Sequence, residues 1–179
     1  MISLAQEDLK RYVRNIPDFP KKGIMFRDIT TLLKDKTAFK ATVDILYEKY
    51  AKSEIEKVAA VEARGFITGA ALADRLGAGF VLLRKPGKLP SETLRENYKL
   101  EYGEDGIEIH KDAITLGERI LLHDDLLATG GTISAACNLV EKAGGSIVGV
   151  SFLIELAFLH GRVRLPGQNI FSIMQYDSE

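Results

Sequence analysis

Four short apolar segments, separated by stretches of a different pattern, constrain the fold of this chain most strongly. They are KVAAVE (57–62), GFVLLR (79–84), RILLHD (119–124) and SIVGVSFLIEL (146–156). Continuous apolar runs of this length are typical of strands that are buried on both faces. Helical patterns follow two of them, at ITGAALADRL after Gly65 and from Ile133 onward. Strands that alternate with helices indicate an α/β domain with a mostly parallel sheet.

Other segments predict the elements that flank this sheet. Apolar residues recur at helical spacing at Phe39, Val43, Leu46 and Tyr50, which predicts a helix with one buried face. The amphipathic N-terminal stretch SLAQEDLKRYV predicts a short first helix, and NIFSIMQY (169–176) can form a last strand.

Two segments are expected to be loops. IPDFPKKGIMFRDIT (16–30) contains two prolines and a glycine, which is typical of an extended loop. Residues 85–106 show neither helical nor strand periodicity and predict a long loop. The alternating segment IEIHKDAI (107–114) that follows predicts an exposed strand.

Length and composition indicate one domain, residues 1–179, that is large enough for a sizeable core. A formal net charge of −1 gives no indication of a nucleic-acid-binding surface. A single cysteine, Cys137, excludes an internal disulfide, and the three histidines lack the spacing of metal ligands. Without an apolar signal segment or a membrane-spanning run, the chain is expected to be cytoplasmic.

The segment ILLHDDLLATGGT (120–132) contains more polar and small residues than a turn between a strand and a helix needs. A glycine-rich turn that opens a helix directs backbone N–H groups outward, and the helix dipole favours an anion such as phosphate. Gly130 and Gly131 permit close approach of the backbone, while the hydroxyls of Thr129 and Thr132 add donors. A helix cap with an acidic first turn is the structural alternative.

Two acids, Asp124 and Asp125, stand just before this turn. Carboxylates repel a phosphate, but they accept hydrogen bonds from vicinal hydroxyls such as those of a ribose, or help to hold a hydrated Mg²⁺. A phosphate-binding turn beside two diol acceptors predicts a site for a ribose 5-phosphate.

HDDLLATGGT resembles the phosphoribosyl-pyrophosphate signature of type I phosphoribosyltransferases, and DDLLATGGT is similar to the adenine-specific branch of that family. IPDFPKKGIMFRDIT, ARGF, LLRKPGKLP, LEYG and IELAFLHGR resemble further segments of the branch, in the same order, and together cover nearly the entire chain. His123 departs from the family, which usually has an aliphatic residue there; a tolerated substitution at a strand end is the simplest explanation.

The resemblance implies the type I phosphoribosyltransferase fold, an α/β fold with a mostly parallel central sheet flanked by helices. It also implies a small N-terminal hood, approximately residues 1–35, that binds the base, and a flexible catalytic loop at 85–106. The implied reaction joins adenine to phosphoribosyl pyrophosphate and gives AMP and pyrophosphate. The implied cofactor is Mg²⁺, held mainly by the substrate pyrophosphate and ribose rather than directly by the protein, and the implied assembly is a homodimer.

Catalysis of such a displacement depends mainly on positioning and electrostatics, because positive charge develops on the sugar and negative charge on the leaving pyrophosphate. Arg64, Arg84, Lys85 and Lys88 follow predicted strands and can meet the leaving group. By resemblance, the backbone of Ala63 and Arg64 forms part of the pyrophosphate loop, and the arginine of RKPGK can reach across a dimer interface. A solvated run of charges is the structural alternative for 84–88.

The remaining site residues are implied by resemblance alone. The phosphoribosyl group would contact Asp124, Asp125, Leu127, Ala128, Thr129, Gly130, Gly131 and Thr132. Phe26 would stack on one face of adenine and Leu159 on the other, with the backbone of Met25 and Arg27 at its Watson–Crick edge; ordinary core packing is the alternative for Phe26 and Leu159. Glu101 and Tyr102 would act on the catalytic loop, which closes over a water-sensitive glycosyl cation.

Two other functions are weighed against this one. A regulator that senses phosphoribosyl pyrophosphate would need a DNA-binding module, for which the chain offers neither a basic patch nor spare residues. A phosphoribosyltransferase for a 6-oxo purine is disfavoured by the residues of LLATGGT and by those of the hood segment, PDFP and MFRD. A panel of purine substrates distinguishes all three.

Overall fold

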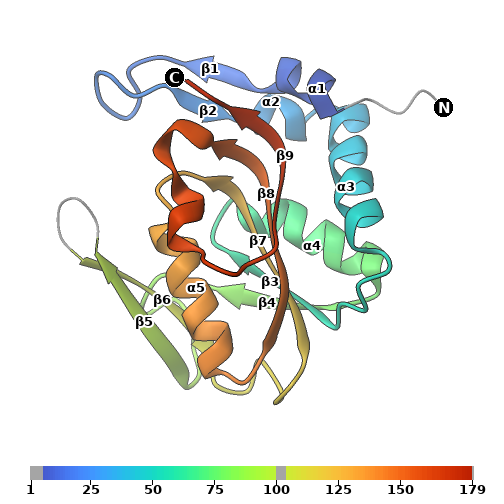
Figure 1. The fold of residues 1–179 in the computed structure, drawn as a ribbon, viewed down its shortest axis with the longest axis vertical. Coiled ribbons are helices and arrows are strands. Elements are labelled where there is room, and N and C mark those ends of the chain that lie inside the picture. Colours follow the sequence, from blue (N-terminus) through green and yellow to red (C-terminus); the bar gives the residue numbers. More distant parts are fainter. Residues whose placement is uncertain (1–5, 100–103, 179) are drawn as a thin grey trace.

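The structure, a computed structural model, describes residues 6–99 and 104–178 (Figure 1). Five strands form the central sheet in the order β4-β3-β7-β8-β9, and every neighbouring pair is parallel. Their bounds are β3 (Lys57–Val61), β4 (Gly79–Leu83), β7 (Arg119–Leu127), β8 (Ser146–Leu156) and β9 (Ile170–Tyr176). The predicted parallel sheet and its strands are therefore confirmed. The strand expected at 119–124 continues for three further residues and carries both aspartates.

Helices cover both faces of this sheet. α4 (Gly65–Leu76) contacts β3 and β7, and α3 (Lys36–Tyr50) packs against α4 on the same face. α5 (Gly131–Lys142) contacts β7 and β8 on the opposite face. Asp35 caps the N-terminus of α3, and its side chain accepts hydrogen bonds from the backbone N–H groups of Thr37 and Ala38, both at 2.9 Å. Among the described helices, none has the length and apolarity to cross a membrane.

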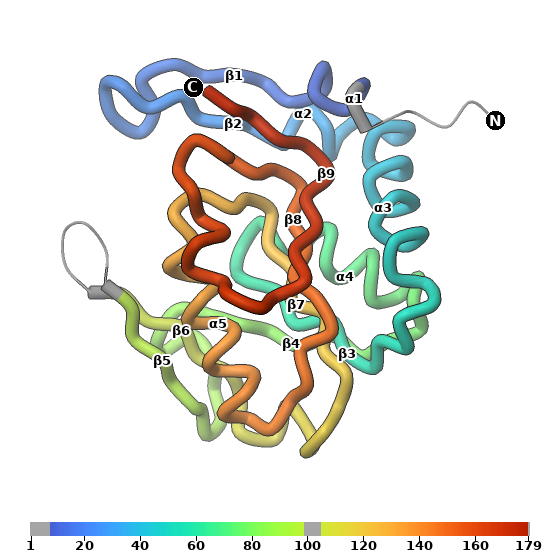
Figure 2. The backbone as a smooth tube through the Cα atoms, viewed as in Figure 1, coloured from blue at the N-terminus to red at the C-terminus, as the bar shows by residue number. Residues whose placement is uncertain are grey.

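The N-terminal elements form a small layer at the end of the sheet toward which β8 and β9 run (Figure 2). Their bounds are α1 (Gln6–Leu9), the 3-10 helix η1 (Lys10–Tyr12), β1 (Arg14–Ile16), β2 (Phe26–Asp28) and α2 (Thr30–Leu33). β1 and β2 pair antiparallel. The prediction of an extended loop over 16–30 is therefore wrong at both ends of that range, where these two strands lie. Arg14 secures the pair by an ion pair with Asp28 at 2.5 Å. The backbone N–H of Thr30, together with Arg14, lowers the pKa of Asp28 to about 2.

The long loop expected over 85–106 is wrong for most of its second half. β5 (Thr93–Lys99) and β6 (Glu104–His110) pair as an antiparallel hairpin that packs on α5. One face of β5 carries Leu94, Glu96 and Tyr98. Glu96 turns inward and pairs with Lys142 of α5. Because a charged residue stands at this inward position, the sequence of β5 does not show the alternation of apolar and polar residues that is typical of a strand. Ile107 and Ile109 of β6 are buried, so the strand expected to be exposed belongs to the core.

Candidate active site

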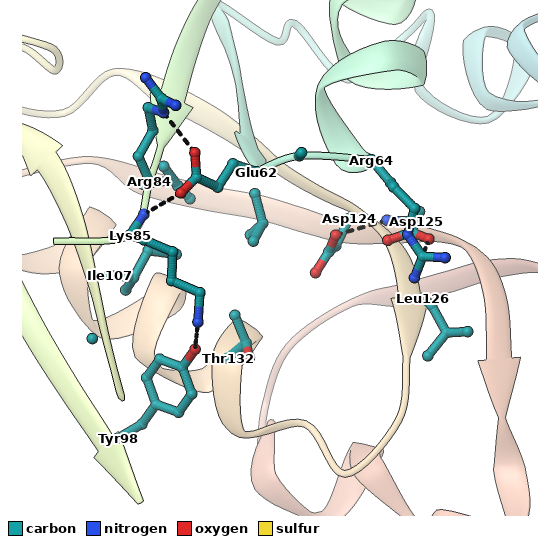
Figure 3. A pocket seen from close by; sticks show the side chains of 14 residues that line it. Glu62, Arg64, Arg84, Lys85, Tyr98, Ile107, Asp124, Asp125, Leu126 and Thr132 are labelled. Carbon is teal, nitrogen blue, oxygen red and sulfur yellow. Dashed lines mark hydrogen bonds and ion pairs between the residues drawn. The ribbon is translucent and has the colours of Figure 1, made fainter. Parts of the chain in front are cut away.

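A cleft of about 230 Å³ lies at the carboxyl ends of β3, β4 and β7, where ligands of parallel α/β sheets commonly bind (Figure 3). A smaller hollow of about 80 Å³ adjoins it and shares three lining residues with it, Asp124, Leu126 and Thr132. The cleft is lined by Val61, Glu62, Ala63, Arg64, Leu83, Arg84, Lys85, Tyr98, Gly106, Ile107, Asp124, Asp125, Leu126 and Thr132.

The turn predicted to hold a phosphate lines the smaller hollow with every residue from Leu127 to Thr132. Gly130 adopts φ = +82° immediately before α5, a conformation that disfavours any residue with a Cβ. A Cβ at Gly130 would also lie 2.4 Å from the carbonyl oxygen of Gly161. The strand, turn and helix thus take the arrangement expected of an anion-binding site.

The two acids on β7 have different surroundings. Asp124 points into the cleft, whereas Asp125 is only 6% exposed and turns toward Arg64 (Figure 3). Nη2 of Arg64 lies 2.9 Å from Oδ2 of Asp125, an ion pair by distance, although the angle is not that of a hydrogen bond. Burial, and then the charge of Asp125, raises the pKa of Asp124. Burial also raises the pKa of Asp125, against the effect of Arg64.

Glu62, to which the sequence analysis gave no role, organises the positive side of the cleft. Nε of Arg84 lies 2.6 Å from Oε2 of Glu62, and the backbone N–H of Lys85 donates to Oε1 at 2.7 Å. Burial works to raise the pKa of Glu62, but these two partners hold it below its usual range. The signal available in the sequence was its position, directly after an apolar strand and before Ala63.

The remaining predicted cations differ in their access to the cleft. Nζ of Lys85 lies 3.3 Å from the Tyr98 hydroxyl (Figure 3). It also contacts Asp105, which like Tyr98 lies on the β5–β6 hairpin. Lys88 does not line the cleft, although its charge helps to lower the pKa of Glu62. Ala63 lines the cleft as well, and α4 begins directly after Arg64.

None of the predicted base-binding residues is among those that line the cleft. The ring of Phe26 lies 5.1 Å from the guanidinium carbon of Arg64 and 5.0 Å from the Phe19 ring, a neighbour that the sequence did not suggest. Met25 is half-buried just before it. Leu159 is 38% exposed at the end of the 3-10 helix η2 (Ala157–Leu159), which follows β8.

The side chain of Arg27 is engaged away from the cleft. Nη1 of Arg27 donates to Oδ1 of Asn15 at 2.6 Å, and its guanidinium carbon lies 4.0 Å from the Tyr176 ring centroid. Nε of Arg27 is buried and has no hydrogen-bond partner among the described residues. The two residues expected on the catalytic loop, Glu101 and Tyr102, lie outside the described residues.

His123, the departure from the family pattern, is fully buried and joins three elements. Nε2 lies 2.8 Å from Oγ1 of Thr68 on α4, and Nδ1 lies 2.8 Å from Oγ of Ser151 on β8. Because Ser151 donates its own proton to the carbonyl oxygen of Leu122 at 3.2 Å, the network assigns the histidine proton to Nδ1. His123 is therefore a satisfied neutral residue of the core and no metal ligand.

Comparisons with known proteins agree with this geometry. A family model described as "Phosphoribosyl transferase domain" matches residues 28–164. The adenine phosphoribosyltransferases of Geotalea daltonii and Trichlorobacter lovleyi are 56% and 58% identical to this chain, each over 95% of this chain and 99% of the relative. The crystal structure of adenine phosphoribosyltransferase from Thermoanaerobacter pseudethanolicus shares 53% identity with a TM-score of 0.93, over 96% of this chain and 100% of that one.

The fold is that of a phosphoribosyltransferase, and the chain belongs to that family. Within the family it belongs to the adenine phosphoribosyltransferase branch, because its relatives in that branch match it over nearly their full length.

Burial lowers the pKa of His123 to about 4, and this shift predicts a pH dependence of stability. The unfolded chain takes up this proton near pH 6.5, whereas the folded chain does so only near pH 4, so acid favours unfolding between these values. Between pH 7 and pH 5 this residue should remove about 2 kcal/mol from the free energy of unfolding. In His123→Leu that part of the loss should be absent, as urea titrations at the two pH values would show. An equal loss in both proteins would contradict this assignment.

Proposed function

We propose that this cleft binds phosphoribosyl pyrophosphate and adenine and transfers the 5-phosphoribosyl group to adenine, forming AMP and releasing pyrophosphate. One observation carries the proposal. The phosphate-binding turn at 127–132, the Asp124–Asp125 pair and the Arg64 guanidinium converge on two adjoining hollows at one edge of the sheet. An anion site, diol acceptors and a cation in that order match a ribose that carries a phosphate at one end and a leaving pyrophosphate at the other.

The phosphate and the ribose are held by different parts of β7 and the turn. Backbone N–H groups before α5, with the hydroxyls of Thr129 and Thr132, bind the 5-phosphate. Asp124, which faces both hollows, accepts hydrogen bonds from the ribose hydroxyls, and Asp125 assists while it orients Arg64. The Asp125 contact matters because it keeps the Arg64 guanidinium at the cleft rather than in solvent.

The pyrophosphate is met by cations. Arg64, Arg84 and Lys85 line the cleft and stabilise the negative charge that develops on the leaving group, with Ala63 in the supporting turn and Lys88 adding charge nearby. Among residues 6–99 and 104–178 no three acidic, histidine or cysteine residues form a cluster suited to a metal. By resemblance to the family, Mg²⁺ would be held mainly by the substrate, with Asp124 and Asp125 able to accept hydrogen bonds from its water shell, and would supply charge neutralisation of the pyrophosphate.

Adenine is placed between the N-terminal layer and the segment after β8. Phe26 stacks on one face and Leu159 covers the other, while the backbone of Met25 and Arg27 reads the amino group and the adjacent ring nitrogen. A role for the backbone of Arg27 is supported by its side chain, which contacts Asn15 and Tyr176 instead of the cleft. Adenine as the bound base is supported by a relative, the yeast adenine phosphoribosyltransferase, whose crystal structure is described as complexed with an imino-altritol bisphosphate and adenine. That protein is 37% identical with a TM-score of 0.89, over 94% of this chain and 97% of that one.

Two further assignments come from the resemblance to the family. By resemblance, Glu101 and Tyr102 act on the catalytic loop, which serves as the lid. A homodimer is supported by exposed apolar side chains on α4 and on the edge strand β4, Ile67 at 44% and Leu82 at 38%. A cytoplasmic location stays a prediction of the sequence.

The proposed activity is tested with a panel of bases. The purified protein, phosphoribosyl pyrophosphate and Mg²⁺ are incubated with adenine, hypoxanthine, guanine or xanthine, and nucleotide formation is followed by chromatography. We expect AMP from adenine, and rates lower by tenfold or more, roughly, for the 6-oxo bases, because reversed donors and acceptors leave backbone groups unpaired. Nucleotide from a 6-oxo base alone would establish the second enzyme. Binding of phosphoribosyl pyrophosphate without any product would favour the sensor.

The two acids are tested separately. Asp124→Asn and Asp125→Asn should each weaken binding of phosphoribosyl pyrophosphate by roughly ten- to a hundredfold, because a charged acceptor for a ribose hydroxyl is lost. Titration calorimetry measures the affinity, and thermal unfolding checks that the fold is retained. Asp44→Asn, which removes a surface partner of Arg75, is the matched control. Wild-type affinity in both site variants would remove the ribose assignment.

Glu101 is assigned to the chemical step, where its carboxylate stabilises the developing positive charge or manages a proton of the purine. In either role its interaction grows toward the transition state, so Glu101→Gln should lower kcat and kcat/KM together, by about 10²- to 10⁴-fold. Glu92→Gln, at an exposed glutamate paired with Lys111 just before β5, serves as the control. A change in KM alone would make Glu101 an ordinary solvated acid.

A further inference from the structure

Glu155, near the end of β8, is a buried carboxylate whose two oxygens are both occupied. It is 4% exposed. Nε and Nη2 of Arg162 donate to Oε1 and Oε2 at 2.6 and 2.7 Å, a bidentate pair. Oε2 also accepts from Oγ of Ser172 at 2.6 Å and from Nε2 of Gln175 at 3.2 Å, both on β9. Burial works to raise the pKa of Glu155, but Arg162 and the β9 donors hold it below the usual range.

The Glu155–Arg162 pair closes the short segment 156–161, which runs from the last residue of β8 to the first residue of the 3-10 helix η3 (Gly161–Arg164), in the orange-red part of Figure 1. This segment holds Leu159, the residue assigned to one face of adenine. It also holds Gly161, whose backbone packs against the phosphate-binding turn. A Cβ at Gly161 would lie 2.2 Å from the carbonyl oxygen of Ala128.

One ion pair therefore supports two parts of the site, Leu159 and the phosphate-binding turn. Since Glu155 is fixed in the sheet and the guanidinium fork of Arg162 can satisfy it in only one orientation, the ends of the segment are held at a fixed separation. Any displacement of the segment moves Leu159, and through the contact of Gly161 with Ala128 it also moves the turn that binds phosphate.

We propose that Glu155 and Arg162 are a positioning pair that sets the adenine-contacting residue Leu159 and the phosphate-binding turn in register with each other. The inference rests on the proposed function for the role of Leu159. Neither residue touches the reacting atoms. Their effect is on how well the base and the 5-phosphate are held at the same time.

A purely structural role for Glu155 is the competing explanation, because its other two hydrogen bonds tie β8 to β9. Ser172 separates the two roles. Ser172→Ala removes a bond between the same carboxylate and β9 without touching Arg162. If the pair were purely structural, its loss would have the same effect as the loss of the Ser172 bond. Both would lower the thermal midpoint without changing substrate binding.

The test compares wild type, Glu155→Gln, Arg162→Ala, Arg162→Lys and the Glu155→Gln/Arg162→Ala double variant, with Ser172→Ala and Arg75→Ala as controls. Arg162 is 44% exposed, so its truncation spares the core, and Glu155→Gln keeps the shape of the buried side chain. For each protein, KM for adenine, kcat, the affinity for ribose 5-phosphate and the thermal midpoint are measured.

We expect KM for adenine to rise between about tenfold and a hundredfold in Glu155→Gln and Arg162→Ala, the scale of a small misplacement. Ribose 5-phosphate should bind more weakly, Arg162→Lys should recover part of both losses, and the double variant should be no worse than the poorer single one. Ser172→Ala and Arg75→Ala should lower only the thermal midpoint.

An unchanged KM for adenine in Glu155→Gln and Arg162→Ala overturns the proposal. A KM that rises in step with the loss of thermal midpoint in every variant, Ser172→Ala included, also overturns it, as does an additive double variant. Failure of the proposed function has a separate signature, namely that wild type forms no AMP. In that case the affinity for ribose 5-phosphate still decides the positioning role of the pair, because it reports on the contact between Gly161 and Ala128 without any base.

Discussion

Backbone pairing holds β7 between β3 and β8, and the geometry of the cleft follows from that position. The two parallel ladders set His123 opposite Ala60 and Leu127 opposite Glu155. Because side chains alternate along a strand, a slip of one residue would exchange the directions of Asp124 and Asp125. Apolar side chains of β7 are buried on both faces of the sheet, which makes such a slip costly. The register that protects the core is thus the register that presents Asp124 to the cleft.

The cations around the cleft are each paired with a carboxylate of the same chain. Arg64 lies against Asp125, Arg84 against Glu62, and Lys85 against Asp105. Such pairing holds long side chains near the position of an incoming pyrophosphate and limits the repulsion among neighbouring positive charges. An arriving anion then competes with carboxylates for these cations, so its binding free energy is the difference between two sets of ion pairs and remains moderate.

Apolar runs made the parallel strands and their order along the chain predictable, because burial on both faces leaves a signal that needs no knowledge of the partner strands. The turn after β7 was predictable for a similar reason, since its glycines and hydroxyls serve a local purpose. The β5–β6 hairpin escaped prediction because Glu96 faces inward to a distant lysine. Glu62 and Glu155 escaped as well, since their partners come from other elements and no local pattern distinguishes a buried, paired glutamate from a solvated one.

His123 has a consequence for how this sequence can change over evolutionary time. An aliphatic residue at this position would remove the partner of the Thr68 hydroxyl and the donor to the Ser151 hydroxyl, which would keep only its bond to the carbonyl oxygen of Leu122. The histidine can in turn be accommodated only where both hydroxyls already exist, since its two ring nitrogens each need a partner. A chain that changes from one arrangement to the other by single substitutions therefore passes through a less stable variant, unless several substitutions occur together. Descendants of this chain should consequently keep or lose Thr68, His123 and Ser151 together.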